Sequence, residues 1–132
     1  MVIPLFCKQF LENTRPTIYG DGENSRDFTF VENAVQANVL ALFHGMEPTG
    51  AQVLKSHEVF NVACKDQTTL NQTVKILQQI TGRSVEPLYG PERAGDVRHS
   101  KASIGKIAEQ LKYQPRQRFG VGHGLALGWC MD

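Results

Sequence analysis

Short runs of β-forming residues alternate with longer runs of helical periodicity through most of this chain. Strands are predicted at residues 17–19, 27–31, 59–64 and 85–89. Helices are predicted at residues 4–11, 32–43 and 68–81, and a fourth helix bears Ile104, Ile107, Ala108 and Leu111. The run 59–64 is apolar enough for a strand buried inside a sheet. Strands that alternate with helices predict an α/β fold.

Several of these elements begin or end at residues whose backbone chemistry suits a boundary. Pro4 fits the first turn of a helix, where an N–H group would have no helical partner. Thr68 or Thr69 is predicted to cap the third helix, and Gly82 to end it. Gly20 and Gly22 allow the positive φ angles of a tight turn.

Composition excludes several classes of protein. The 132 residues are 41% apolar and 20% charged, which is ordinary for a globular protein and unlike a disordered chain. The net charge of +1 gives no reason to expect a nucleic acid or an anionic membrane as partner. The longest apolar run is far short of the ~20 residues of a membrane span. Residues 1–10 do not resemble a signal peptide, so a cytoplasmic location is expected.

Cysteines and histidines show no spacing typical of a metal site. Cys7, Cys64 and Cys130 lie far apart, beside apolar residues, and form no Cys-x-x-Cys pair. They are predicted to be buried, reduced thiols. The histidines also lack ligand spacing, so no metal is expected; they are His44, His57, His99 and His123.

Two glycine-containing loops each carry an arginine after a predicted strand. Arg26 follows Tyr19-Gly-Asp-Gly, and Arg93 follows Tyr89-Gly-Pro-Glu. A guanidinium group presents a planar fork of donors that matches phosphate oxygens, so two converging arginines suit a diphosphate. The residues alone favour surface arginines paired with Asp27 or Asp96, because arginine usually lies on surfaces.

Six short motifs occur in an order that resembles a known family. They are Ile3-Pro-Leu-Phe6, Ile18-Tyr-Gly-Asp-Gly22, Arg26-Asp-Phe28, Val59-Phe-Asn-Val62, Arg93-Ala-Gly-Asp-Val-Arg-His-Ser100 and a closing pattern around Tyr113-Gln-Pro115, Gly124-Leu125 and Trp129. Together they resemble the C-terminal part of the extended short-chain dehydrogenases of the NAD-dependent epimerase/dehydratase family. The likeness is greatest to UDP-glucose and UDP-N-acetylglucosamine 4-epimerases. Residues 61–70 and 95–100 favour the N-acetylhexosamine branch.

The resemblance implies a set of nucleotide-sugar-binding residues. Ile3, Pro4 and Phe6 match a segment that borders the uracil end of the pocket. Tyr19 matches a position beside the base, and Val62 a position that lines the base pocket. Arg26 and Arg93 match the residues that bind the diphosphate, and Asp96 matches one near the ribose and the second arginine. Purely structural roles stay open for Tyr19 on the sheet, for Asp96 in a turn and for Val62 in the core.

The family's cofactor and catalytic signatures do not occur in this sequence. There is no Gly-x-x-Gly-x-x-Gly or Gly-x-Gly-x-x-Gly turn, where backbone N–H groups would meet the NAD pyrophosphate. None of the three tyrosines is followed four residues later by the lysine that would lower its pKa. We therefore expect residues 1–132 to be one C-terminal nucleotide-sugar-binding region with remnants of a Rossmann sheet, without the NAD-binding half and inactive alone.

Three residues depart from what is usual in the family. Asn33 and Ser103 stand where aspartates are common, and each is expected to keep a capping role. His123 replaces a glutamate. Gly105 inside the fourth helix is expected to cost about 1 kcal/mol relative to alanine.

The leading hypothesis is part of a NAD-dependent UDP-sugar 4-epimerase whose complete form binds NAD and a UDP-sugar and is a homodimer. A nucleotide-sugar 4,6-dehydratase and a UDP-glucuronate decarboxylase share this region and remain alternatives. So do a non-catalytic UDP-sugar-binding module and an inactive truncated product. The isolated chain is expected to self-associate, because faces that pack on the cofactor domain would be bare.

Overall fold

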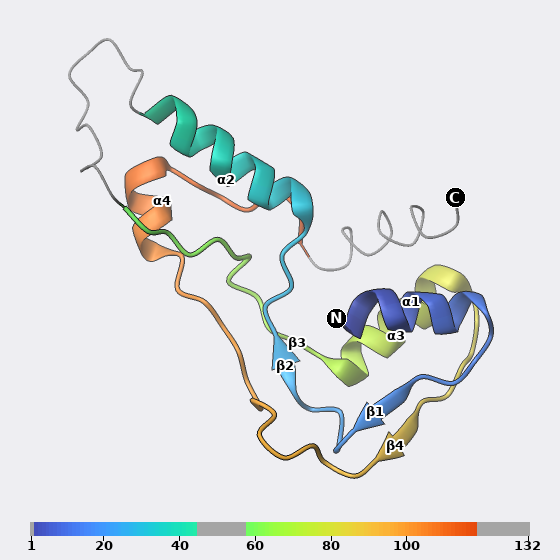
Figure 1. Cartoon of the computed structure of the whole chain (residues 1–132). Helices are drawn as coiled ribbons and strands as arrows, with labels where there is room; N and C mark the ends of the chain where they lie inside the picture. Colours follow the sequence, from blue (N-terminus) through green and yellow to red (C-terminus); the bar gives the residue numbers. More distant parts are fainter. Residues whose placement is uncertain (1, 45–57, 119–132) are drawn as a thin grey trace. The chain divides into compact units, whose positions relative to one another are not determined.

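The computed structural model describes residues 2–44 and 58–118, which divide into two compact units (Figure 1). The first unit contains residues 2–26 and 67–100, and the second contains residues 27–44, 58–66 and 101–118. Helices alternate with short strands along the chain, as the sequence predicts for an α/β protein. None of the described helices is long and apolar enough to cross a membrane.

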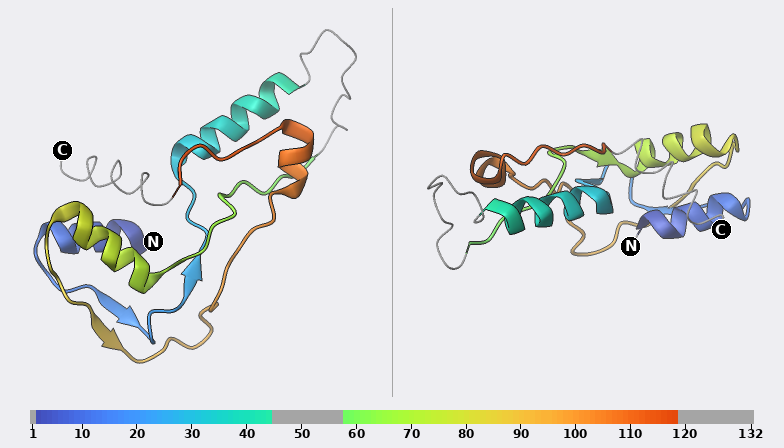
Figure 2. Two further views of the ribbon diagram at one scale, coloured as in Figure 1. Left: turned by 180° about the vertical axis from the view of Figure 1, so that it is seen from behind. Right: turned by 90° about the horizontal axis from the view of Figure 1, so that it is seen from above.

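The first unit places two helices beside two small sheets. Helices α1 (Val2–Leu11) and α3 (Leu70–Thr81) lie side by side in Figures 1 and 2. Strand β1 (Thr17–Tyr19) pairs in parallel with β4 (Leu88–Gly90), and β2 (Ser25–Arg26) pairs antiparallel with β3 (Thr68–Thr69). A parallel bridge joins Ser25 to His99 on the other side of β2. Strand β2 thus contains Arg26, and its Ser25 pairs with His99 in the loop that carries Arg93.

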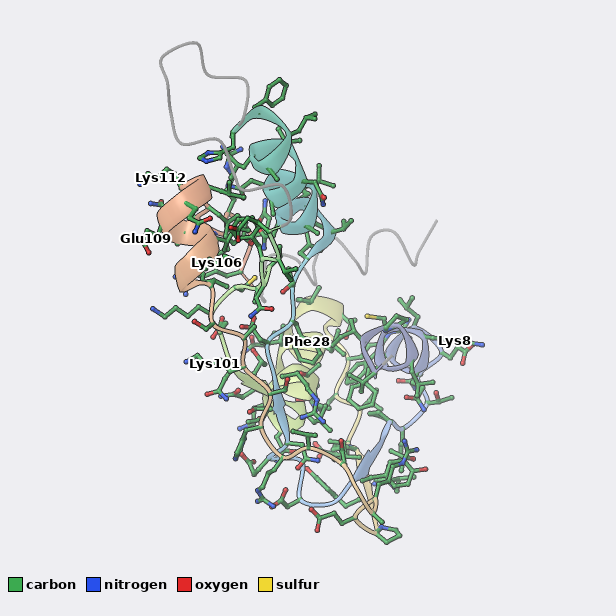
Figure 3. All side chains as sticks on the ribbon, turned by 60° about the vertical axis from the view of Figure 1, so that its left-hand side comes forward. Lys8, Phe28, Lys101, Lys106, Glu109 and Lys112 are labelled. Carbon is green, nitrogen blue, oxygen red and sulfur yellow. The ribbon has the colours of Figure 1, made fainter. Side chains whose placement is uncertain are left out.

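The core of the first unit is apolar and joins α1, α3 and β1. Its fully buried members are Phe6, Cys7, Phe10, Ile18, Val74, Leu77 and Val85. Lys8, by contrast, extends away from α1 with its side chain 71% exposed (Figure 3). Helix α1 therefore buries one stripe and leaves the other in solvent, as its periodicity predicts.

Both ends of α3 are confirmed as predicted. Thr69 accepts a hydrogen bond from the Gln72 N–H group at 3.1 Å, and the Gln72 side chain accepts one from the Thr69 N–H group at 2.9 Å. This reciprocal capping box satisfies two N–H groups that the helix cannot. Gly82 ends the helix in the left-handed conformation with φ of 66°, which glycine adopts without steric cost.

The second unit packs α2 (Val31–His44) against α4 (Gly105–Leu111) and the segment 58–66. Its buried core consists of Ala37, Ala63, Ile104, Ile107, Leu111 and Tyr113. The Tyr113 hydroxyl donates a hydrogen bond to the Ala63 carbonyl at 3.2 Å, so the phenol is satisfied inside this core. Figure 3 shows Lys106, Glu109 and Lys112 on α4, and Lys106 reaches Glu58 at 2.6 Å.

Two predicted strands are wrong. Residues 59–64 are extended but form no strand, and Val59 is 81% exposed. Residues 27–30 also form no strand. The backbone segments that pair with this part of the chain lie opposite Ser25 and Arg26 instead. A strand needs a neighbour for its N–H and C=O groups, and the described residues of the second unit offer none to either segment. The predicted strand 85–89 lies later, at Leu88–Gly90.

Two predicted caps in the second unit are also wrong. Ser103 does not cap α4, whose N-cap is Ile104 without a side-chain hydrogen bond. Gly105 is the first helical residue, where its flexibility costs less than in the interior. Asn33 lies inside α2 and is fully buried, and its Oδ1 accepts the N–H groups of Arg116 and Gln117, both at 3.0 Å.

Cys7 and Cys64 are buried, as predicted. The predictions on Cys130, His57, His123 and the segment from Gly124 to Trp129 lie outside the described residues.

Candidate functional site

A pocket of about 360 Å³ lies in the first unit, at the ends of β1 and β2. One part of its wall is apolar and the other carries charge. The lining residues are Val2, Leu5, Phe6, Thr17, Tyr19, Asn24, Arg26, Leu70, Arg93 and Asp96. Such a cavity, with a few convergent polar groups, is typical of a small-molecule site.

Tyr19 and Arg93 form one side of the pocket. Tyr19 ends β1 and is 37% exposed, and the Arg93 guanidinium lies over its ring at 3.9 Å from the centroid. Gly90 pairs with Tyr19 across the parallel sheet, and the Tyr19 ring lies over it, 3.4 Å from the position that a Cβ atom would take. A guanidinium over an aromatic face is a favourable cation–π contact.

Arg26, Asp96 and Asn24 form a chain of hydrogen bonds on the other side. Arg26 Nη2 donates to Asp96 Oδ1 at 2.7 Å, and Asn24 Nδ2 donates to Asp96 Oδ2 at 2.9 Å. Arg26 Nη1 also donates to the backbone carbonyls of Ser25 and Val97. The side chains of Arg26 and Asp96 are about one-third exposed, at 29% and 34%, so both remain open to a ligand.

Ser25 ties the two arginine-bearing loops together. Its N–H group donates to the Arg98 carbonyl at 2.8 Å, and its own carbonyl accepts from the Ser100 N–H group at 3.1 Å. Its hydroxyl lies 2.9 Å from His99 Nδ1. These contacts fix residues 98–100 alongside β2, although every side chain from 91 to 100 is exposed. His99 and Ser100 accordingly hold the loop in place.

The turn at residues 20–24 is fixed from two directions. Arg98 forms an ion pair with Asp21 at 2.6 Å, and Asn71 donates to the Asp21 carbonyl at 3.0 Å. The Asp21 pKa is lowered, first by the hydrogen bond from the Glu23 N–H group and then by Arg98. Gly22 has φ of 78° and faces Asn71 so closely that any Cβ atom would clash. Glycine is therefore required at this position.

Five of the eight predicted site residues line the same pocket: Phe6, Tyr19, Arg26, Arg93 and Asp96. Ile3 packs against the core of the first unit, and Pro4 is exposed on α1 without lining the pocket. Val62 belongs to the second unit and packs against that unit's core. Arg26 pairs with Asp96, as the alternative interpretation expected, and it also lines the pocket.

Sequence reasoning missed half of the lining residues. Val2, Leu5 and Thr17 flank predicted site residues on the same elements, so helical and strand periodicity could have found them. Leu70 is the first residue of α3 and was assigned only to the helix's apolar stripe. Asn24 stands two positions before Arg26 but was treated as part of a turn.

The Gly20–Gly22 turn differs from a dinucleotide-binding turn. The Gly20–Gly22 turn connects two strands and does not open onto a helix N-terminus, which is where a pyrophosphate binds.

Burial raises the pKa of the Cys64 thiol and of the Tyr113 phenol, so both stay protonated at neutral pH. Both groups lie in the core of the second unit, where they have structural contacts.

Comparison with known proteins agrees with this site. Residues 1–63 match the model of the NAD dependent epimerase/dehydratase family. A solved UDP-glucose 4-epimerase of Thermotoga maritima, with UDP-glucose, is 35% identical with a TM-score of 0.85. The match covers 99% of this chain and 39% of that one. The chain belongs to the NAD-dependent epimerase/dehydratase family.

Other members of the NAD-dependent epimerase/dehydratase family match over similar spans. The UDP-glucuronic acid 4-epimerase of Bacillus cereus, solved with UDP-glucuronic acid and NAD, is 27% identical with a TM-score of 0.84, over 99% of this chain and 40% of that one. A dTDP-glucose 4,6-dehydratase of an Actinoplanes strain is 28% identical over 97% of this chain and 38% of its own length. The chain thus spans about two-fifths of the length of the relatives it matches.

Proposed function

We propose that residues 1–132 are the nucleotide-sugar-binding region of a NAD-dependent UDP-sugar 4-epimerase. The observation that carries this proposal is the convergence of Arg26 and Arg93 on one pocket from two loops 67 positions apart in sequence. Guanidinium groups are the usual partners of a diphosphate, because their fixed donors match pairs of phosphate oxygens. The family to which the chain belongs adds independent support.

The two parts of the pocket suit the two parts of a nucleoside diphosphate. Val2, Leu5, Phe6 and Leu70 offer apolar surface for a base, while Arg26 and Arg93 offer charge for the phosphates. Asp96 lies between these groups and can accept hydrogen bonds from ribose hydroxyls. In this proposal Tyr19 lies at the junction, with Arg93 held over its ring.

The chemistry of the sugar would be performed by the complete enzyme. NAD, when bound in the complete enzyme, would supply the hydride acceptor and donor for chemistry at C4 of the sugar. In this proposal the described residues bind and orient the nucleotide, and cofactor-binding and acid–base groups belong to other parts of the enzyme. Cytoplasmic location, homodimerisation of the complete enzyme and a substrate from the N-acetylhexosamine branch are parts of the same proposal.

A second candidate is a nucleotide-sugar dehydratase or decarboxylase. Relatives named dTDP-glucose 4,6-dehydratase and UDP-N-acetyl-alpha-D-glucosaminuronate decarboxylase match 97% and 99% of this chain. The pocket residues recognise a diphosphate, which all these substrates contain. The identity of the reaction therefore rests on groups that act at the sugar ring.

Calorimetry with UDP tests the proposed diphosphate contacts. Arg26→Ala and Arg93→Ala are each expected to weaken binding by roughly tenfold or more, since each removes charged hydrogen bonds. Arg93→Lys should also weaken it despite keeping the charge, because an ammonium group has no planar fork. Arg15→Ala is the matched control, since Arg15 is exposed and bonds only the carbonyls of Glu86 and Pro87 among the described residues. Unchanged affinity in both alanine variants would contradict the proposal.

The same chain is expected neither to bind NAD nor to convert UDP-N-acetylglucosamine. It lacks a glycine-rich dinucleotide turn and a Tyr-x-x-x-Lys pair. Purified protein should show no nicotinamide fluorescence after incubation with NADH and no product by chromatography. Turnover by a homogeneous sample would contradict the proposal that the cofactor-binding and acid–base groups belong to other parts of the enzyme.

A further inference from the structure

Asn24 is buried at the edge of the pocket and contacts the proposed phosphate-binding pair. We propose that Asn24 is a positioning residue that keeps the Asp96–Arg26 ion pair monodentate and so leaves Arg26 donors for the phosphates of a nucleotide. This inference rests on the proposed function of the pocket. Asn24 is 4% exposed, whereas Arg26 and Asp96 are each about one-third exposed.

Asn24 is held firmly enough to orient the carboxylate of Asp96. Its backbone carbonyl accepts the Leu70 N–H group at 3.2 Å, which attaches it to the start of α3. Its side-chain amide points the other way and donates to Asp96 Oδ2 at 2.9 Å. A buried amide whose backbone is bonded to the start of a helix is a rigid donor, because packing leaves its side chain little freedom.

Asp96 lacks such support of its own. It lies in the loop 91–100, and its side chain is 34% exposed against 4% for Asn24, so packing restricts its carboxylate less than it restricts Asn24. Its two oxygens have different partners: Oδ2 accepts from Asn24 and Oδ1 accepts from Arg26. The carboxylate therefore presents one oxygen, and not both, to the guanidinium.

Arg26 has five N–H donors, as every arginine does. Nη1 donates to the carbonyls of Ser25 and Val97, and Nη2 donates once to Asp96. Two donors, one on Nη2 and the one on Nε, have no hydrogen-bond partner among the residues that the structure describes. A carboxylate can also take a guanidinium through two parallel hydrogen bonds, and that fork is the geometry that a phosphate would use.

The amide of Asn24 decides between these two arrangements. While it holds Oδ2, the carboxylate of Asp96 is oriented with Oδ1 toward the guanidinium. Without it, Oδ2 has lost its protein donor and the carboxylate is free to rotate toward the guanidinium. Asp96 would then compete with the phosphate for the same donors. The effect of Asn24 should consequently depend on Asp96 and on the charge of the ligand.

Calorimetry with UDP and with uridine tests this dependence. Asn24→Ala is expected to weaken UDP binding by roughly tenfold, the scale of one charged hydrogen bond, and to weaken uridine binding less, because uridine offers ribose hydroxyls to Asp96 but no phosphate to Arg26. In an Asp96→Ala background the same substitution should have no further effect on UDP. Asn71→Ala is the matched control: it removes hydrogen bonds to the 20–24 turn and to Tyr89 without touching Asp96. Equal losses for UDP and uridine, or a full loss in the Asp96→Ala background, would overturn the proposal.

Two further measurements keep the outcome decisive. Asn24→Asp preserves the shape of the side chain but repels Asp96, so it should weaken UDP binding at least as much as Asn24→Ala. It serves as the test if the alanine variant does not fold. Nitrogen-detected NMR of the Arg26 guanidinium needs no ligand: Asn24→Ala should slow rotation about its Cζ–N bonds as a bidentate pair forms. A wild-type chain that binds no UDP would contradict the proposed function, while an unchanged Arg26 spectrum in Asn24→Ala would separately overturn this inference.

Discussion

Tyr19 and Arg93 were both expected to contact a nucleotide, and they contact each other. The Arg93 guanidinium lies 3.9 Å from the centre of the Tyr19 ring. Arg93 is in an exposed loop, so this stacking contact is the described interaction that orients its side chain toward the pocket. In the proposed function, Tyr19 therefore acts in phosphate binding through Arg93, whether or not a base lies beside it.

Substitutions at Tyr19 should separate the ring from its hydroxyl. Tyr19→Phe keeps an aromatic face and should bind UDP as the wild type does. Tyr19→Leu removes the cation–π contact, worth about 0.5–1 kcal/mol at an exposed site, and should weaken UDP binding by roughly two- to fivefold. Calorimetry on both variants measures the difference. A phenylalanine variant as weak as the leucine variant would show that the hydroxyl, and not the ring, matters.

Individual site residues were predictable where a family motif marked them. Phe6, Arg26 and Arg93 were proposed from the resemblance, since neither composition nor spacing could show that their loops meet. Asn24 was missed because an asparagine in a glycine-containing loop usually means an exposed turn. Its burial depends on Leu70 and Asp96, which lie 46 and 72 positions later. Such a contact is visible only in the folded chain.

Among the elements, the 20–24 turn is the most dependent on charge. Asp21 accepts the Glu23 N–H group at 2.9 Å and pairs with Arg98 at 2.6 Å. Both contacts favour the carboxylate, and the Asp21 pKa is accordingly lowered from its ordinary value of 3.8. A lowered pKa in the folded state adds stability above the unfolded pKa, and that stability is lost as the pH falls through the folded pKa.

Asp21→Asn should therefore destabilise the chain at neutral pH and not at acid pH. Asparagine can still accept the Glu23 N–H group, but it cannot form the ion pair with Arg98. Thermal melts followed by circular dichroism should show a lower Tm than the wild type at pH 7, and the difference should shrink as the pH falls below about 4. Glu86→Gln, which changes an exposed carboxylate elsewhere, controls for net charge. A difference that is constant with pH would contradict the linkage.

Elements with local determinants were predicted well, and those defined by partners were not. Thr69, Gln72 and Gly82 specify both ends of α3 within the helix itself. Residues 59–64 have the composition of a buried strand, but a strand exists only where another backbone pairs with it. In α2 the apolar stripe of Val35, Val39 and Leu42 has the right period, yet the buried residues are Asn33 and Ala37. Periodicity shows that a face exists and not what covers it.

At the scale of the whole molecule, both units leave large apolar side chains exposed. In the second unit, Val31, Val35, Leu42, Phe43 and Val59 are 63%, 56%, 66%, 57% and 81% exposed. Four of these side chains lie on α2, at spacings that place several of them on one helical face. Monomeric proteins seldom expose contiguous apolar patches beyond a few hundred Å². The chain also spans only 39% of the length of the Thermotoga maritima epimerase that it matches.

The 132-residue polypeptide, studied by itself, should consequently bind hydrophobic dyes and self-associate. Extended segments with unpaired backbone groups add to this tendency, since they can pair with another chain. Light scattering should show a mass that rises with concentration, and dye fluorescence should rise above that of a compact globular control. Val35→Gln combined with Leu42→Gln should reduce both signals, because it makes the bare face of α2 polar. Val97→Gln changes a 59%-exposed residue of the other unit and should reduce neither. A monodisperse monomer with a sharp melt and no dye binding would show instead that this region folds independently, and that the exposed face of α2 is simply solvated.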